Sequence, residues 1–348
     1  MAGPLPPIPL VILTGFLGAG KTTRLNRWLA DPALADTLVI INEFGSVGLD
    51  HLLVEETPGE MVLMAAGCLC CTIRGDLVAT LEDLLRRRDN RRIAPFRRIL
   101  IETTGLADPL PILQSVLQHP YLSKRFGIAG LATLVDAVHG GDTLARHAEA
   151  RRQVALADRL LLTKLDLAGP GMIAALEEAV SGLNPTTRLL REEPPDFAST
   201  LFDNRFEPWR ETGSGIEAWL DAAEGAGPAH APGHEANRHG LDIESFSFVS
   251  DHPVRPESLV VFQEAMRILH GPRLLRLKGL VAMADDPERP AVIHHVQSVT
   301  HPLQRLARWP GRDRRTRLVF IVQGIPRETI ETFWSALVRA ESGAQESR

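Results

Sequence analysis

The segment Gly15-Phe-Leu-Gly-Ala-Gly-Lys-Thr22 constrains the fold of this chain more than any other. It matches the pattern G-x-x-x-x-G-K-[ST], in which glycines allow backbone N–H groups to surround a phosphate. An apolar run, Pro9 to Thr14, precedes the motif, and a helical pattern, Lys21 to Ala30, follows it. Because the motif requires a strand before it and a helix after it, the sequence predicts an α/β domain around a phosphate-binding loop (P-loop).

Short apolar runs alternate with helical patterns over residues 1–224. This alternation predicts a parallel sheet with helices on both faces. Further strands are predicted at Leu38 to Ile41, Met61 to Met64, Ile99 to Ile101, Leu131 to Val135 and Leu160 to Leu162, and a helix at Asp76 to Arg87.

A change of pattern marks a second domain. Residues 225–240 are rich in Ala, Gly, Pro and His without an apolar period, which predicts a linker. Residues 241–348 are expected to form a smaller α+β domain with a mainly antiparallel sheet. Its predicted strands are Leu241 to Val249, Leu274 to Met283, Ala291 to Ser298 and Thr316 to Val322, and its predicted helices are Pro256 to Leu269 and Arg327 to Arg339.

Charge and hydropathy argue against some classes of partner. A formal charge of -5 and a pI near 6.2 argue against a protein that binds nucleic acid. No apolar run approaches the ~20 residues that a membrane span needs. The first ten residues lack a basic region and a long apolar core, so they do not resemble a signal peptide. We therefore expect a cytoplasmic protein that works without a membrane.

The P-loop is expected to hold the phosphates of a nucleotide. Lys21 would bridge the β- and γ-phosphates and contribute to catalysis, and the Thr22 hydroxyl would ligate Mg²⁺. The N-terminus of the following helix adds a favourable dipole. The residues of this loop predicted to contact the nucleotide are Gly15, Gly18, Ala19, Gly20, Lys21, Thr22 and Thr23.

A second motif indicates which base is bound. Thr163, Lys164 and Asp166 follow the predicted strand Leu160 to Leu162 directly. A carboxylate at Asp166 can accept hydrogen bonds from two donors of guanine, a pair that adenine lacks. The stem of Lys164 would lie along the base plane. The first residue of this motif is usually Asn, and here it is Thr163. The motif predicts GTP and GDP as the nucleotides.

Two glutamates also follow predicted strands. Glu102 ends the strand from Ile99 and precedes Gly105 by three residues, which suits a sensor of the γ-phosphate and a water-mediated contact to Mg²⁺. Glu43 follows the strand Leu38 to Ile41 in the same way. Both glutamates are therefore predicted, with Lys21, to be catalytic.

All three cysteines of the chain, Cys68, Cys70 and Cys71, fall within four positions. Thiolates so close together repel one another unless a soft cation or a disulfide intervenes, and Zn²⁺ is the usual partner in a reducing compartment. Three thiolates leave one tetrahedral position for a fourth ligand. Three buried structural cysteines, or a disulfide between Cys70 and Cys71, are the alternatives. Because ligands of a doubly wound sheet bind beyond the carboxyl ends of its strands, the cysteines are expected near the nucleotide.

Taken together, the motifs resemble those of the CobW-type GTPases, including the YjiA-like and zinc-regulated metallochaperone branches. The segments that carry the resemblance are GFLGAGKTT, NEFGSVGLD, GCLCC, ETTGLADP and LLTKLD, then LLRLKGLV, VQSVTHP and TRLVFIV. The resemblance implies slow GTP hydrolysis, Zn²⁺ or another transition metal at the cysteines, and transfer of this metal to a client protein. It also implies metal ligands at Glu43 and His119. Members of the family serve zinc homeostasis, cobalamin synthesis or nitrile hydratase maturation.

Two alternatives come from other classes of protein. A P-loop kinase acting on a small molecule would prefer adenine, and Lys164 and Asp166 argue against it. A non-catalytic scaffold would dock partners through residues 241–348, and the intact Lys21 and Glu102 argue against it. The leading hypothesis is a GTP-dependent metallochaperone. The client and the oligomeric state, including a homo-oligomer, stay open.

Overall fold

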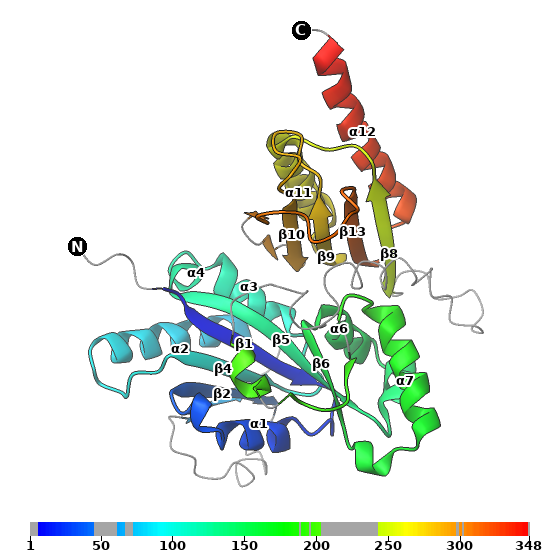
Figure 1. Ribbon diagram of the computed structural model, residues 1–348. Coiled ribbons are helices and arrows are strands. Elements are labelled where there is room, and N and C mark those ends of the chain that lie inside the picture. Colours follow the sequence, from blue (N-terminus) through cyan, green and yellow to red (C-terminus); the bar gives the residue numbers. More distant parts are fainter. Residues whose placement is uncertain are drawn as a thin grey trace. The chain divides into compact units, whose positions relative to one another are not determined.

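The computed structural model describes residues 6–44, 61–66, 72–202 and 243–346, except 188, 195, 297–298 and 301–302. The side chains of 42–76, 199, 299–302 and 340–348 lie outside the described part. The chain divides into two compact units (Figure 1). The first comprises Met1–Glu177 and Leu189–Phe206, and the second comprises Glu178–Arg188 and Glu207–Arg348. The predicted linker, 225–240, lies outside the described residues.

The first unit contains a seven-stranded parallel sheet in the order β3-β2-β4-β1-β5-β6-β7. Its strands are β1 (Ile8–Gly15), β2 (Thr37–Phe44), β3 (Met61–Ala66), β4 (Arg98–Thr103), β5 (Phe126–Asp136), β6 (Arg159–Thr163) and β7 (Leu189–Leu190). Its helices are α1 (Lys21–Leu29), α2 (Thr72–Asp89), α3 (Leu110–Gln118), α4 (Leu122–Arg125), α5 (Gly140–Arg146), α6 (Ala148–Leu156) and α8 (Phe197–Thr200), with short 3₁₀ turns at Pro32–Leu34 (η1) and Leu165–Leu167 (η3). Helix α7 (Pro170–Leu183) begins in this unit, and its residues from Glu178 onward are assigned to the second. The predicted parallel α/β sheet is confirmed.

The helices cover both faces of this sheet, as Figure 1 shows for α1 and α3. The chain moves in one direction along the sheet from β1 to β2 and in the opposite direction from β3 to β4. Right-handed crossovers therefore place α1 and α2 on opposite faces. The central strands are buried on both sides, and all five residues of β6 are buried. This double burial explains why the strands read as continuous apolar runs in the sequence.

The register of the sheet determines which residues meet at its carboxyl edge. Glu102 of β4 lies beside Leu13 of β1 and Ile41 of β2. Asp136, the last residue of β5, lies beside Thr163, the last residue of β6. Because all the strands are parallel, the residues that end β1, β4, β5 and β6 lie along one edge.

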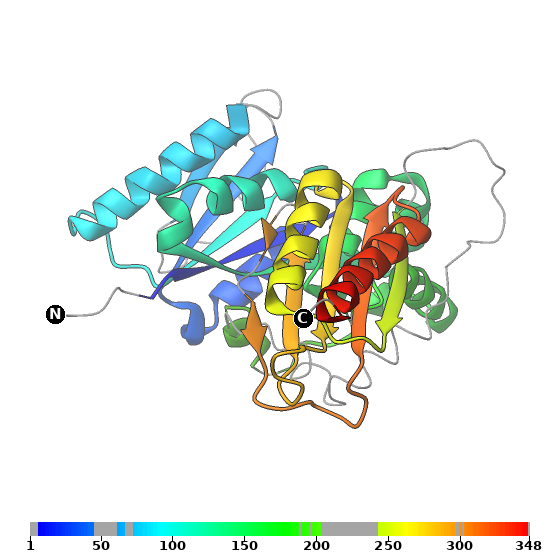
Figure 2. The same ribbon diagram turned by 90° about the horizontal axis from the view of Figure 1, so that it is seen from above.

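The second unit contains an antiparallel sheet in the order β11-β10-β9-β13-β8, with β12 paired to β10. Its strands are β8 (Ile243–Ser250), β9 (Leu274–Val281), β10 (Ala291–Val296), β11 (Val299–Thr300), β12 (Gln304–Arg305) and β13 (Thr316–Gln323). The helices α11 (Pro256–His270) and α12 (Arg327–Glu346) lie on one face of the sheet (Figure 2). The predicted α+β architecture is confirmed, and α12 runs beyond the predicted end at Arg339.

Apolar side chains from both helices and the sheet form the core of the second unit. Phe262 of α11 and Trp334 of α12 pack edge to face, with ring centroids 4.9 Å apart. Phe320 of β13 stacks on Phe246 of β8 at 5.4 Å. The four rings belong to one apolar core that joins the two helices to the sheet, whose strands β9, β10 and β13 are buried along their whole length. Among the described helices of the whole chain, none is long and apolar enough to cross a bilayer.

Candidate nucleotide site

Two glycines of the P-loop have a conformation that other residues rarely adopt. Gly18 has a φ of 75° and Gly20 a φ of 83°, both in the left-handed region. Gly20 is also the residue that caps the N-terminus of α1. A side chain at either position would strain the backbone, because Cβ disfavours positive φ. The loop therefore depends on these two glycines to turn from β1 into α1.

The ammonium group of Lys21 lies across the P-loop. Its Nζ donates to the carbonyl oxygen of Gly15 at 2.9 Å and to that of Phe16 at 3.3 Å. The positive charge is thus held within the turn that the motif forms. The role of Lys21 toward the phosphates stays a prediction.

The end of β4 faces the first turn of α1. The Thr22 hydroxyl donates to Oε1 of Glu102 at 3.1 Å, and Glu102 is 5% exposed. A hydroxyl and a carboxylate are both hard oxygen donors, which Mg²⁺ prefers. The pair that the sequence assigned to Mg²⁺ is therefore brought together, and the chemistry of its oxygens fits that ion.

The loop after β4 touches the P-loop at Gly105. A Cβ built on Gly105 would lie 2.6 Å from the backbone nitrogen of Leu17 and 2.7 Å from its Cα. Only a glycine permits two backbone segments to approach so closely. Gly105, predicted from its spacing to Glu102, is thus held against the P-loop.

Thr163 connects β6 to the P-loop. Its hydroxyl is 2.9 Å from the carbonyl oxygen of Ala19 and 3.3 Å from that of Val135, and the residue is 5% exposed. A hydroxyl has a single hydrogen to donate, so the shorter contact to Ala19 is the stronger one. Thr163 therefore lies at the site through a bond to the P-loop backbone.

Lys164 and Asp166 follow in a sharp turn. Lys164 has a φ of 56°, and its Nζ lies 2.7 Å from Oδ2 of Asp136. Asp166 lies in the 3₁₀ turn η3 and is exposed. Its contact with a base stays a prediction.

Asp136 is a site residue that the motif analysis missed. Its carboxylate accepts from Lys164 and from the backbone N–H groups of Val138, at 2.8 Å, and His139, at 3.2 Å. Burial disfavours the charged carboxylate, but these hydrogen bonds outweigh burial and hold the pKa of Asp136 below its ordinary value. The signal in the sequence was an acidic residue directly after the apolar run Leu131 to Val135, as at Glu102.

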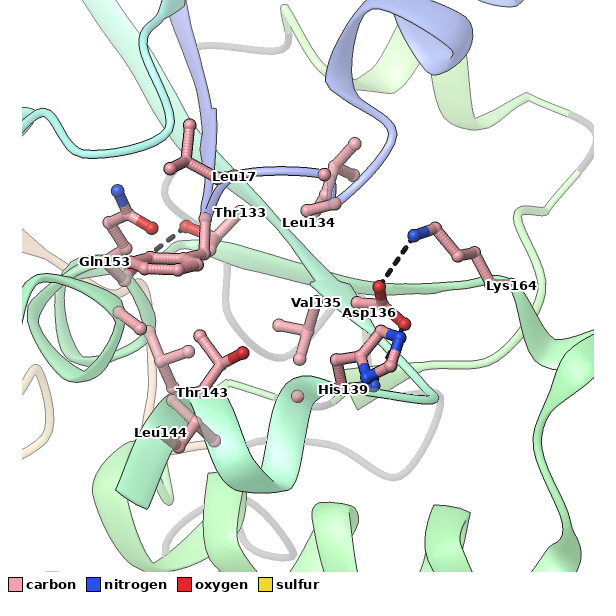
Figure 3. Close-up of a pocket in the computed structure, with 16 residues that line it drawn as sticks. Leu17, Thr133, Leu134, Val135, Asp136, His139, Thr143, Leu144, Gln153 and Lys164 are labelled. Carbon is pink, nitrogen blue, oxygen red and sulfur yellow. Dashed lines mark hydrogen bonds and ion pairs between the residues drawn. The ribbon is translucent and has the colours of Figure 1, made fainter. Parts of the chain in front are cut away.

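A cavity of about 220 Å³ lies beside the P-loop (Figure 3). The P-loop, the end of β5, and helices α5 and α6 surround it. In Figure 3, Asp136, His139 and Lys164 lie on one side and Gln153 on the other. Phe16 also lines the cavity, and its ring lies 4.5 Å from the ring of His147. The cavity thus joins the region of the predicted base to the helix α6.

The predicted metal ligands are described only in part. Cys68, Cys70 and Cys71 lie outside the described residues, as does the side chain of Glu43. The backbone of Glu43 lies at the end of β2, beside Ala65 of β3. Their assignments as metal ligands stay predictions. Among the described residues, no cluster of three His, Cys, Asp or Glu side chains is suited to a metal ion.

His119 lies at the end of α3, against α2. Its Nε2 is 3.7 Å from Oε1 of Glu82, and its Nδ1 is 3.4 Å from the backbone nitrogen of Leu122. Glu82 is ten residues beyond Thr72, where α2 begins, which corresponds to about 15 Å along the helix. The cysteines precede Thr72, so His119 lies beside a later part of α2, and its role as a metal ligand stays a prediction.

Comparison with known families accounts for both units. The protein family described as CobW/HypB/UreG, nucleotide-binding domain, matches residues 9–191. The protein family described as cobalamin synthesis protein cobW C-terminal domain matches residues 243–338.

Similar proteins match over nearly the whole chain. The zinc chaperone YjiA of Escherichia coli is 31% identical over 95% of this chain and 99% of its own. The zinc chaperone CobW of Pseudomonas aeruginosa is 29% identical over 93% of this chain and 89% of its own. The crystal structure of Zn(II)-bound YjiA GTPase from E. coli superimposes with a TM-score of 0.67 at 26% identity, covering 96% of this chain and 99% of that one.

Proposed function

The chain belongs to the CobW family of P-loop GTPases, and from that premise we propose that it carries Zn²⁺ at Cys68, Cys70 and Cys71 and transfers it to a client protein. GTP and Mg²⁺ would occupy the site around Lys21 and Thr22. The nucleotide state would control how tightly the metal is held. The family's nucleotide-binding domain argues against the kinase and scaffold alternatives.

The order of the strands is the observation that carries this proposal. In the sequence, the cysteines follow β3 and the P-loop follows β1. Glu43 lies near the end of β2, and Glu102 lies near the end of β4. These strands are neighbours in the order β3-β2-β4-β1. At a strand spacing of about 4.8 Å, β3 and β1 are separated by about 14 Å. A metal bound after β3 and a γ-phosphate bound after β1 would then have only β2 and β4, with their two glutamates, between them.

The chemistry of three thiolates supports Zn²⁺ as the cargo. Zn²⁺ prefers thiolate ligands in tetrahedral sites, and three thiolates leave one position open. The carboxylate of Glu43 or a group of the client would fill it. An open position permits exchange of the metal, whereas four protein ligands would favour permanent binding. The curated relatives from E. coli and P. aeruginosa, both named zinc chaperones, support the same cargo.

The decisive experiment measures Zn²⁺ affinity in two nucleotide states. Competition with a chromogenic chelator would be done in GDP and in a non-hydrolysable GTP analogue, for the parent chain and a Cys68/Cys70/Cys71→Ser variant. We expect one tight Zn²⁺ in the parent, lost in the variant, with an affinity that differs about 5- to 150-fold between the two states. Because thiolates must lose their protons to bind, affinity should also fall with falling pH.

Two outcomes would count against the proposal. Equal stoichiometry and affinity in the cysteine variant would place the metal elsewhere. Equal affinities in GDP and in the GTP analogue would leave a GTPase with a structural zinc rather than a chaperone. Service to cobalamin synthesis or nitrile hydratase maturation is an alternative for the client, and a chain that prefers Co²⁺ over Zn²⁺ in the same titration would favour it.

A further inference from the structure

A buried glutamine of α6 holds the loop that follows β4. The amide nitrogen of Gln153 donates to the carbonyl oxygen of Gly105 at 3.1 Å and to that of Ala107 at 3.0 Å. Gln153 is 1% exposed, so water does not compete for these bonds. An amide nitrogen has two hydrogens, and here each carbonyl receives one. The side chain therefore holds two carbonyl groups of the loop that lie two residues apart.

The neighbouring residue adds a second connection. Arg152 lies 2.8 Å from Oδ2 of Asp108, and the other oxygen of Asp108 accepts from the backbone N–H of Leu110 at 3.0 Å. Asp108 thus connects α6 to the first turn of α3. Helix α6 therefore contacts the loop in two ways: Gln153 bonds to carbonyl groups of the loop backbone, and Arg152 pairs with the side chain of Asp108.

Helix α6 is itself fixed to the sheet and to the P-loop. The hydroxyl of Thr133, in β5, donates to the backbone carbonyl of Gln153 at 3.0 Å (Figure 3). His147, which precedes the helix, packs its ring on Phe16 of the P-loop. Helix α6 and the residue before it therefore contact both the P-loop, through His147, and the loop after β4, through Gln153.

The held loop lies against the P-loop, the segment that is predicted to hold the phosphates of GTP. Its first residues follow Glu102, which bonds to Thr22, and Gly105 touches the backbone of Leu17. We propose that Gln153 is a positioning residue for GTP hydrolysis: it holds Gly105 and Ala107 so that the loop is already in place against the P-loop when GTP binds. This inference rests on the family's GTPase activity and is independent of the proposed zinc transfer.

The proposal predicts an effect on hydrolysis that differs from a general loss of stability. Gln153→Met keeps the length of the side chain and removes both donors. The loop would then lose its fixed position, and a displacement of about 1 Å can slow a reaction by about 100-fold. GDP has no γ-phosphate, so its affinity should change by less than about twofold. Affinity for a GTP analogue should fall more than affinity for GDP.

The experiment compares the full-length parent, Gln153→Met and Gln263→Met. Gln263, in α11 of the second unit, is also buried, at 7% exposure, and serves as the matched control. Single-turnover GTP hydrolysis, the affinities for GDP and a GTP analogue, and the melting temperature would be measured. We expect hydrolysis by Gln153→Met to fall at least tenfold, with Gln263→Met near the parent rate. A parent-like rate in Gln153→Met, or equal losses for GDP and GTP analogue, would overturn the proposal.

Two further variants keep the test decisive if Gln153→Met does not fold. In Gln153→Glu, a neutral carboxyl donates one hydrogen bond and an ionised one donates none. Its hydrolysis rate relative to the parent should therefore rise as pH falls, and a ratio independent of pH would contradict the role of Gln153.

The second variant, Arg152→Gln, changes a side chain that is 32% exposed and should fold. If the position of the loop matters for hydrolysis, this variant should hydrolyse GTP more slowly with GDP affinity unchanged, and an unchanged rate would count against that position being needed.

Discussion

The hydroxyl of Thr163 and the carbonyl oxygen of Ala19 lie 2.9 Å apart, which connects the end of β6 to the P-loop. The two residues are separated by 144 positions in the chain. This bond gives a physical reason why Thr serves at a position where the guanine motif usually has Asn. Both residues can donate a hydrogen bond to a backbone carbonyl.

Removal of that donor should weaken the site. Thr163→Val has the same shape but leaves the carbonyl of Ala19 without its partner. We expect a loss of about 1–3 kcal/mol in the free energy of unfolding and weaker binding of GDP. Denaturant unfolding and nucleotide titration would measure both. Thr163→Asn should retain GDP binding, and if it binds no better than Thr163→Val, the hydrogen bond is not what the position requires.

The choice of base should depend on Asp166. Asp166→Ala removes the acceptor for the two guanine donors, so the affinity for GTP should fall toward that for ATP. Titration with fluorescent GTP and ATP analogues gives both affinities. Asp251→Ala, at an aspartate whose side chain is 78% exposed in the second unit, is the control. If the parent binds ATP as tightly as GTP, the assignment of Asp166 to guanine recognition is wrong.

Contact between the two loops should not tolerate a methyl group. In Gly105→Ala the new Cβ would lie 2.6 Å from the nitrogen of Leu17, so one backbone must move. Hydrolysis should fall by about 100-fold, the scale of a 1 Å misplacement, while GDP still binds. Gly141→Ala is the control, since a Cβ there meets nothing within 4 Å. If Gly105→Ala and Gly141→Ala hydrolyse GTP equally well, the close approach does not matter for catalysis.

The charge of Asp136 should contribute a pH-dependent part of stability. The pKa of Asp136 is lowered in the folded state, so its ionised form stabilises the fold above about pH 3.9, the ordinary value for Asp. This contribution is lost as pH falls through the folded-state pKa. Asp136→Asn keeps an oxygen for the N–H groups of Val138 and His139 but removes the charge beside Lys164.

The free energy of unfolding, measured from pH 7 to pH 3, tests this expectation. The variant should be less stable than the parent at pH 7, and the difference should shrink toward pH 3. A difference that stays constant over this range would mean that the Asp136 charge does not act through Lys164.

Local sequence determined the elements that carry the chemistry. The P-loop was predicted from eight consecutive residues because its glycines and its strand–loop–helix context are local properties. The central strands were predicted because burial on both faces demands continuous apolar runs. Glu102, Gly105 and Thr163 were found because each follows such a run, and parallel strands must end at one edge of their sheet.

Only the tertiary structure decided which of these residues meet. Gly105 touches Leu17 across 88 positions, and Gln153 bonds to Gly105 across 48. Gln153 lies in a helix without a recognisable motif, and its role depends on the distance between α6 and the loop after β4. Asp136 became a site residue only when the pairing of β5 with β6 brought it to Lys164. Short-range patterns determine strands, turns and motifs, whereas such contacts depend on how the elements pack, and packing is a property of residues far apart in the chain.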